Sequence, residues 1–209
     1  QGLIKEAGIT DVEDTDVSPL DSRLRFWKGD ITTLATDAIV NAANSGMTGC
    51  WAPLHYCIDN AIHTFAGIQL RYECARIMIE QGCEEPTGQA KVTPAYNLPA
   101  KHVIHTVGPI ANGEVNDELK EQLASSYRSC LDAAVAAGDK SIAFCCISTG
   151  VFGFPAEEAA KVAVDTVREW LDQHEAACAS DDSRNPVPTV VFNVFLDSDE
   201  EIYKNLLGF

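Results

Sequence analysis

The segment DAIVNAAN, residues 37–44, joins a short apolar run to a pair of asparagines. An apolar run of this length, bounded by polar residues, is typical of a buried strand. A long loop follows, and apolar residues then recur at helical spacing from Ile58 to Ile77, with Gly82 as the expected helix end. The segment therefore predicts a strand–loop–helix unit of an α/β protein.

The alternation continues on both sides of this unit. Further strands are expected in RLRFWKGDI, QAKVTPAY, KHVIHTVGP, SIAFCCIS and TVVFNVFL, and helices over residues 117–138, 155–174 and 198–209. Strands separated by helices of this length predict a mostly parallel sheet covered on both faces, with ligands bound beyond the carboxyl ends of its strands. Residues 1–22 carry six acidic side chains and little apolar periodicity, so we expect an acidic, loosely packed lead-in before one domain over residues 23–209.

Composition narrows the classes of partner. The 209 residues suit one domain, and the formal net charge of −16 comes from 31 acidic against 15 basic residues. Because no cluster of Lys and Arg is present, a nucleic-acid partner or an anionic membrane is not expected. The apolar stretches are too short to span a bilayer, no secretory leader opens these residues, and the eight cysteines do not follow a disulfide framework. We therefore expect a monomer in a reducing, cytoplasmic compartment.

The loop STGVFGFP, residues 148–155, carries residues suited to a nucleotide. Gly150 and Gly153 would let the backbone approach a ligand closely, and Pro155 begins a helix whose N-terminus would face it. Backbone N–H groups in such a loop can hold a diphosphate without net positive charge. Taken alone, these glycines are more simply explained as turns.

Four motifs in this order, WKGDIT, DAIVNAAN, IHTVGP and ISTGVFGFP, closely resemble the macrodomain family. The resemblance covers roughly residues 23 to 208. It implies a three-layer α/β/α sandwich around a mixed, mainly parallel sheet, and ADP-ribose as the ligand.

The resemblance also implies roles for individual residues. Asp30 would accept a hydrogen bond from the adenine amino group, with the Ile31 N–H nearby, and Asn44 would bind the distal ribose. Phe195 would lie against adenine, and the Phe152 ring beside the distal ribose. Gly150, Val151, Phe152 and Gly153 would form the backbone run on the diphosphate, and Ser148 and Thr149 just before it would also bind ADP-ribose. Alternatives are a turn cap for Asp30, a helix or turn cap for Asn44 and a core position for Phe195.

The loop after DAIVNAAN departs from ordinary macrodomains, which fill it with glycines. Here it reads GCWAPLHYCIDNAIH, and Cys50, His55 and Cys57 form a C-x4-H-x-C triplet. Thiolate and imidazole are ligands suited to Zn²⁺, and three protein ligands leave a position open, as in a catalytic site. The triplet alone could be two core cysteines and a solvent histidine. In this loop it resembles the zinc-dependent macrodomain subfamily, whose members pair it with ADP-ribosyl hydrolysis.

Asp59 matches an aspartate that the family places near the distal ribose. We expect Asp59, together with Asn44, to serve catalysis as a base or by holding the ribose; a helix N-cap is the alternative. His63 is expected to be a packing residue, and Asn60 stands where ordinary members have glycine. The leading hypothesis is a zinc-dependent hydrolase that releases mono-ADP-ribose from Asp or Glu side chains of modified proteins. The alternatives are a non-catalytic ADP-ribose reader with structural zinc and an O-acyl-ADP-ribose deacylase.

Overall fold

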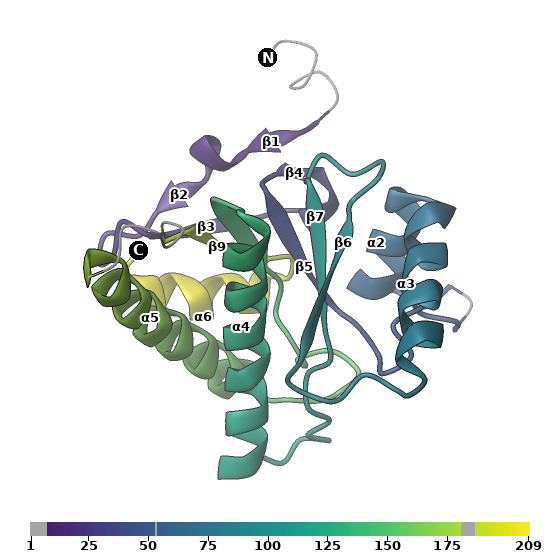
Figure 1. Cartoon of the computed structure of the whole chain (residues 1–209). Helices are drawn as coiled ribbons and strands as arrows, with labels where there is room; N and C mark the ends of the chain where they lie inside the picture. Colours follow the sequence, from purple (N-terminus) through teal and green to yellow (C-terminus); the bar gives the residue numbers. More distant parts are fainter. Residues whose placement is uncertain (1–7, 53, 181–186) are drawn as a thin grey trace.

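A seven-stranded sheet forms the centre of the computed structural model, which describes residues 8–52, 54–180 and 187–209 (Figure 1). The strands lie in the order β2 (Asp16–Val17), β3 (Leu24–Lys28), β9 (Thr189–Val194), β8 (Ser141–Phe144), β5 (Ala38–Ala42), β7 (His102–Thr106) and β6 (Ala90–Pro94). The five inner strands are parallel to one another, and the two edge strands are antiparallel to their neighbours. The predicted mixed, mainly parallel sheet is confirmed.

Helices cover the sheet in two layers. The helices are α2 (Ile58–Ala66), α3 (Ile68–Gln81), α4 (Asp117–Ala137), α5 (Ala156–Ser180) and α6 (Asp197–Leu207). Helix α4 packs on β6, β7 and β8, α6 packs on β3 and β9, and α5 contacts both helices. Helix α2 contacts β5 and α3 contacts β6, and Figure 1 shows these two helices across the strands from α4. This arrangement is the expected three-layer sandwich, and no described helix is long and apolar enough to cross a membrane.

The helix expected from Ile58 to Gly82 is two helices. Gly67 lies between α2 and α3 with a φ of 95°, a conformation that residues with a side chain rarely adopt. A Cβ at this position would lie 2.8 Å from the side-chain amide of Asn97. The break redirects the chain, so that α2 follows β5 and α3 runs beside β6.

The described part of the acidic lead-in, residues 8–22, packs against the domain. Strand β1 (Thr10–Asp11) pairs with β4 (Leu34–Ala35), and β2 pairs with β3. The buried Ser18 donates a hydrogen bond from Oγ to the carbonyl of Leu207, 2.6 Å away. Backbone pairing therefore holds this segment more closely than its acidic composition suggests, whereas residues 1–7 lie outside the described residues.

A buried polar cluster lies between β7 and the two helices α2 and α3. It contains His63, Cys74 and His105, all less than 4% exposed. Burial lowers the pKa of His63 to about 4 and the pKa of His105 to about 3. Both rings are therefore neutral at pH 7 in the folded protein.

Because two histidines are buried in the neutral form, we expect the folded protein to lose stability at acid pH. Their folded-state pKa values lie below the value of about 6.5 in the unfolded chain, so their contribution is complete above pH 6.5 and is lost as pH falls towards 4 and 3. We expect the free energy of unfolding to drop from pH 7 to pH 5, by at most about 2 kcal/mol per histidine. In His105→Gln this drop should shrink, although the variant is less stable at pH 7. Urea unfolding of the wild type and of His105→Gln at both pH values measures this drop. An equally steep drop in His105→Gln would contradict the prediction.

Candidate functional site

The residues expected to bind a ligand follow four neighbouring strands. Asp30 comes after β3, Phe195 after β9, the loop 148–153 after β8 and Asn44 after β5. These four strands are adjacent and parallel in the same order. Their carboxyl ends therefore share one edge of the sheet, and the candidate residues form a row along it.

At one end of the row, Asp30 and Phe195 flank neighbouring strands. Asp30 caps the short helix η2 (Ile31–Thr33), and its Oδ1 accepts hydrogen bonds from the N–H and Oγ1 of Thr32 at 3.0 and 2.7 Å. The turn-cap interpretation thus holds for Oδ1, whereas Oδ2 makes no hydrogen bond to the described residues. Ile31 is buried. Phe195 is 56% exposed, so its ring is a surface group and not a core residue.

The loop after β8 presents unpaired backbone donors. In the described part of the protein, the N–H groups of Gly150, Val151 and Phe152 donate to no backbone acceptor. Gly150 and Val151 are exposed, and the chain enters α5 directly after this loop. Free N–H groups beside a helix N-terminus suit an anion such as a diphosphate.

Other contacts fix the shape of this loop. The carbonyl of Phe152 accepts hydrogen bonds from the N–H groups of Ala111 and Asn112 at 2.8 and 3.0 Å, and Gly153 accepts one from Gly113. The loop is thereby fastened to the segment after β7. Thr149 is turned inward, because its Oγ1 donates to the carbonyl of Cys146. Ser148 is buried, has a φ of 66°, and its Oγ has no partner among the described residues.

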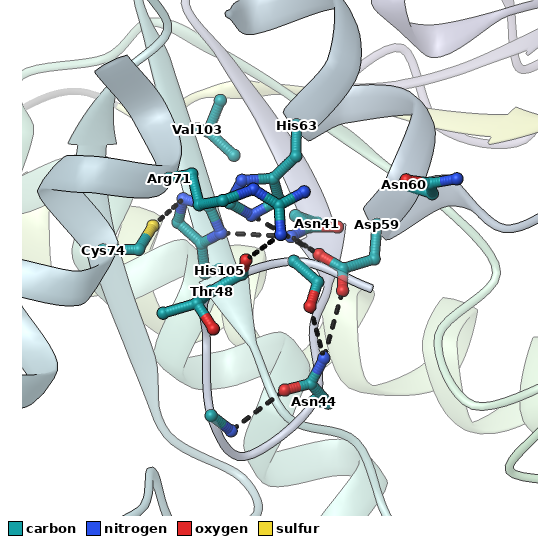
Figure 2. A network of polar contacts seen from close by, with 12 residues as sticks. Asn41, Asn44, Thr48, Asp59, Asn60, His63, Arg71, Cys74, Val103 and His105 are labelled. Carbon is teal, nitrogen blue, oxygen red and sulfur yellow. Dashed lines mark hydrogen bonds and ion pairs between the residues drawn. The ribbon is translucent and has the colours of Figure 1, made fainter. Parts of the chain in front are cut away.

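At the other end of the row, Asn44 meets Asp59 from the first turn of α2 (Figure 2). Nδ2 of Asn44 lies 3.3 Å from Oδ2 of Asp59, and Nδ2 of Asn41 donates to Oδ1 at 2.8 Å. Asp59 is 4% exposed, and burial raises the pKa of its carboxyl group. The N-cap of α2 is Cys57 and not Asp59, so the helix-cap alternative does not describe Asp59. Asn44 also acts as a turn cap, accepting from Gly46 N–H through Oδ1.

Two residues of this network were not predicted from the sequence to belong to the site. Asn41, within DAIVNAAN, donates to Asp59 and contacts Nδ1 of His105 at 3.1 Å. His63, expected only to pack, has Nε2 3.5 Å from Oδ1 of Asp59, and neither ring nitrogen has a hydrogen-bond partner among the described residues. The position of His63 one turn after Asp59 on the same helix was the available signal.

The metal triplet lies at the start of α2. Sγ of Cys50 and Nδ1 of His55 are 3.3 Å apart, and one ligand atom from each of Cys50, His55 and Cys57 lies within 4.8 Å of the others. Zn–S and Zn–N bonds at tetrahedral angles place S and N roughly 3.5 Å apart, so the Cys50–His55 spacing fits zinc. Cys57 Sγ also accepts the Asn60 N–H at 3.4 Å, a contact that suits a thiolate. Among the described residues this group has three members.

The buried group of His63, Cys74 and His105 brings similar ligand types together. Both ring nitrogens of His105 are engaged, Nδ1 with Asn41 and Nε2 with Thr93 Oγ1 at 3.0 Å. A metal there would have to displace these contacts in a closed core. The group is therefore a hydrogen-bonded support for Asn41, and the loop triplet is the better metal candidate.

Named relatives and solved structures resemble this chain closely. A protein-ADP-ribose hydrolase of Treponema medium is 56% identical over the whole chain and 77% of its own length. One from Staphylococcus aureus (strain MRSA252) is 50% identical over 94% of this chain and 70% of its own length. The Trypanosoma brucei macrodomain in complex with ADP-ribose superposes with a TM-score of 0.79 at 33% identity, covering 96% of this chain and 77% of that one.

A mutant of the Oceanobacillus iheyensis macrodomain with ADPR superposes with a TM-score of 0.76 at 36% identity, covering 88% of this chain and 91% of that one. The macro domain family matches residues 40–163, which run from within β5 into α5. These residues include the Asn44–Asp59 pair, the metal triplet and the loop after β8. The chain belongs to the macro domain family.

Proposed function

We propose that this chain is a zinc-dependent hydrolase that removes mono-ADP-ribose from Asp or Glu side chains of modified proteins. The observation that carries the proposal is the Cys₂His triplet at the start of the helix that bears Asp59, at one end of the row of ligand-facing loops. The close relatives named protein-ADP-ribose hydrolase support the reaction, and the related macrodomain structures with ADP-ribose support the ligand.

The row of loops suits an extended dinucleotide-like ligand. Adenine would lie between Asp30 and the exposed ring of Phe195. The diphosphate would accept hydrogen bonds from the unpaired N–H groups of the loop 148–153. The distal ribose would then reach Asn44 and Asp59 at the far end. In this arrangement an acidic protein could bind an acidic ligand, because the dipoles of backbone N–H groups stabilise phosphate without lysine side chains.

Asp59 and Asn44 would act at the distal ribose. Both carboxylate oxygens of Asp59 accept hydrogen bonds from asparagines, so the carboxylate has a fixed orientation. A carboxylate oriented in this way is suited to accept a proton from water or to hold a ribose hydroxyl. Cys50, His55 and Cys57 would hold the zinc, which supplies Lewis-acid polarisation of an oxygen when bound. Because both cysteines must remain thiolates, we place the enzyme in a reducing, cytoplasmic compartment.

Removal of the metal should abolish turnover. We expect chelation, or Cys50→Ala, to lower the release of ADP-ribose from a glutamate-linked modified protein by about 100-fold or more, because a metal contributes several kcal/mol to the transition state. The exposed Cys83→Ala is the matched control and should keep the wild-type rate.

Each other outcome points to a different function. A metal-free preparation with the full rate would exclude the zinc role. A zinc-loaded wild type that binds ADP-ribose but releases none would indicate a reader or a different linkage. Preferred turnover of O-acyl-ADP-ribose in direct competition would indicate a deacylase.

Asp59→Asn should separate catalysis from binding. We expect kcat to fall by about 100-fold or more, as for loss of a general base, with the affinity for free ADP-ribose changed by less than about threefold. Steady-state kinetics and calorimetric titration measure the two effects, and the exposed Asp165→Asn serves as the control. An unchanged kcat would remove Asp59 from the mechanism.

A further inference from the structure

The loop that carries Cys50, His55 and Cys57 is called the metal loop. Its C-terminal half is fixed by the helix that follows it, α2. Nδ2 of Asn60 donates to the carbonyl of His55 at 3.1 Å, and the N–H of Asn60 donates to Sγ of Cys57 at 3.4 Å. Two of the three metal ligands are therefore positioned from the first turn of α2. The third ligand, Cys50, lies at the other end of the loop and needs a separate support.

Arg71, from the first turn of α3, contacts the residues that flank Cys50. Its Nη1 donates to the carbonyl of Thr48 at 2.6 Å (Figure 2). Its guanidinium lies 4.5 Å from the centre of the Trp51 ring. Trp51 is also tied back to Thr48, because its Nε1 donates to Oγ1 at 3.1 Å. One side chain therefore holds the backbone before Cys50 and the ring after it.

The loop passes directly over the guanidinium. Gly49 has a φ of 85°, and a Cβ at this position would lie 2.9 Å from both Nη2 of Arg71 and Cγ of the His63 ring. Only a glycine allows the backbone to come this close. Gly49 also accepts the Asn44 Nδ2 hydrogen bond through its carbonyl, at 3.2 Å. Arg71 thus supports the loop at the point where it leaves the Asn44–Asp59 pair.

Arg71 forms no ion pair with a described carboxylate, although its positive charge acts electrostatically on the nearby Asp59. Arg76, further along α3, pairs with Glu73 and Glu80 on the helix surface. The direct contacts of Arg71 are the Thr48 carbonyl and the Trp51 ring, both in the loop that carries Cys50. A planar guanidinium is suited to both contacts at once, which a lysine cannot reproduce.

We propose that Arg71 is a positioning residue of the metal centre, which sets Cys50 at bonding distance from an ion held by His55 and Cys57. This inference rests on the proposed zinc site. Residues that orient metal ligands typically contribute about 10- to 100-fold to metal affinity, so the loss of Arg71 should weaken zinc binding by this factor. The diphosphate loop follows another strand, so its contacts with the ligand should not depend on Arg71, and zinc affinity is the measurement that reports on this side chain.

The test compares Arg71→Gln with the matched control Arg76→Gln from the same helix. Zinc affinity is measured by competition with a chromophoric chelator, and the ligand geometry by the visible absorption of the Co²⁺-substituted protein. We expect Arg71→Gln to lose zinc affinity by about 10- to 100-fold and to show an altered Co²⁺ spectrum. Arg76→Gln should match the wild type in both measurements.

Two further variants keep the test valid if Arg71→Gln folds poorly. Trp51→Leu removes the stacked ring at a position that is 71% exposed, so the core is untouched. Arg71→Lys keeps the positive charge but loses the planar guanidinium group. Both should fall between wild type and Arg71→Gln in zinc affinity.

Other results would overturn the inference in distinguishable ways. Wild-type zinc affinity in Arg71→Gln, or in Trp51→Leu if the first variant does not fold, would exclude the positioning role of Arg71. The proposed zinc site itself would not be affected by this result. Equal losses of zinc affinity in Arg71→Gln and Arg76→Gln would show that the loss comes from removing a positive charge from α3, and not from the contacts of Arg71. A wild type that takes up no zinc would overturn the proposed metal centre together with its support.

Discussion

The buried carboxylate of Asp59 is the constraint on which the site depends. A buried carboxylate is costly unless hydrogen bonds compensate for its lost hydration. Asn41 and Asn44, both on or just after β5, provide these bonds. These hydrogen bonds hold the start of α2 close to the end of β5. The loop that connects β5 to α2 must therefore begin and end at nearly the same place. The metal triplet is thereby confined to the same edge of the sheet as the ligand-facing loops.

Support for this carboxylate extends into the core and to the surface. Behind Asn41, His105 is held between β5 and Thr93 of β6, so the amide that faces Asp59 has a fixed orientation. On the other side of Asp59, the loop packs on Arg71 through Thr48 and Gly49. A rigid parallel sheet thus positions a loop that has no regular structure of its own, as is common in α/β proteins.

The sequence predicted the architecture because its strands and helices have clear periodicity and clear ends. The break at Gly67 was missed, because apolar residues keep helical spacing on both sides of it and only the positive φ of Gly67 in the structure reveals the turn. The row from Asp30 to Asn44 could be predicted from motif order. The spatial order of these residues along the sheet edge could not be predicted, because it depends on the strand order β3-β9-β8-β5, which local sequence does not encode.

Within the site, the sequence identified residues with recognisable chemistry and missed those that act through tertiary contacts. Cys50, His55 and Cys57 are close in sequence, and their spacing suggested a metal once the loop was seen to resemble the zinc-dependent macrodomain subfamily. Arg71 is far from them along the chain, and nothing in its local pattern distinguishes it from Arg76. The zinc itself, the Asp or Glu linkage and the roles of the individual site residues remain predictions.

The most direct test of a zinc ion beside the distal ribose is a crystal structure of the protein with zinc and ADP-ribose, with anomalous data collected at the zinc edge. We expect one strong anomalous peak bonded to Cys50, His55 and Cys57, with its remaining coordination position directed at the distal ribose beside Asp59. A peak closed by a fourth protein ligand, or located away from the distal ribose, would contradict it.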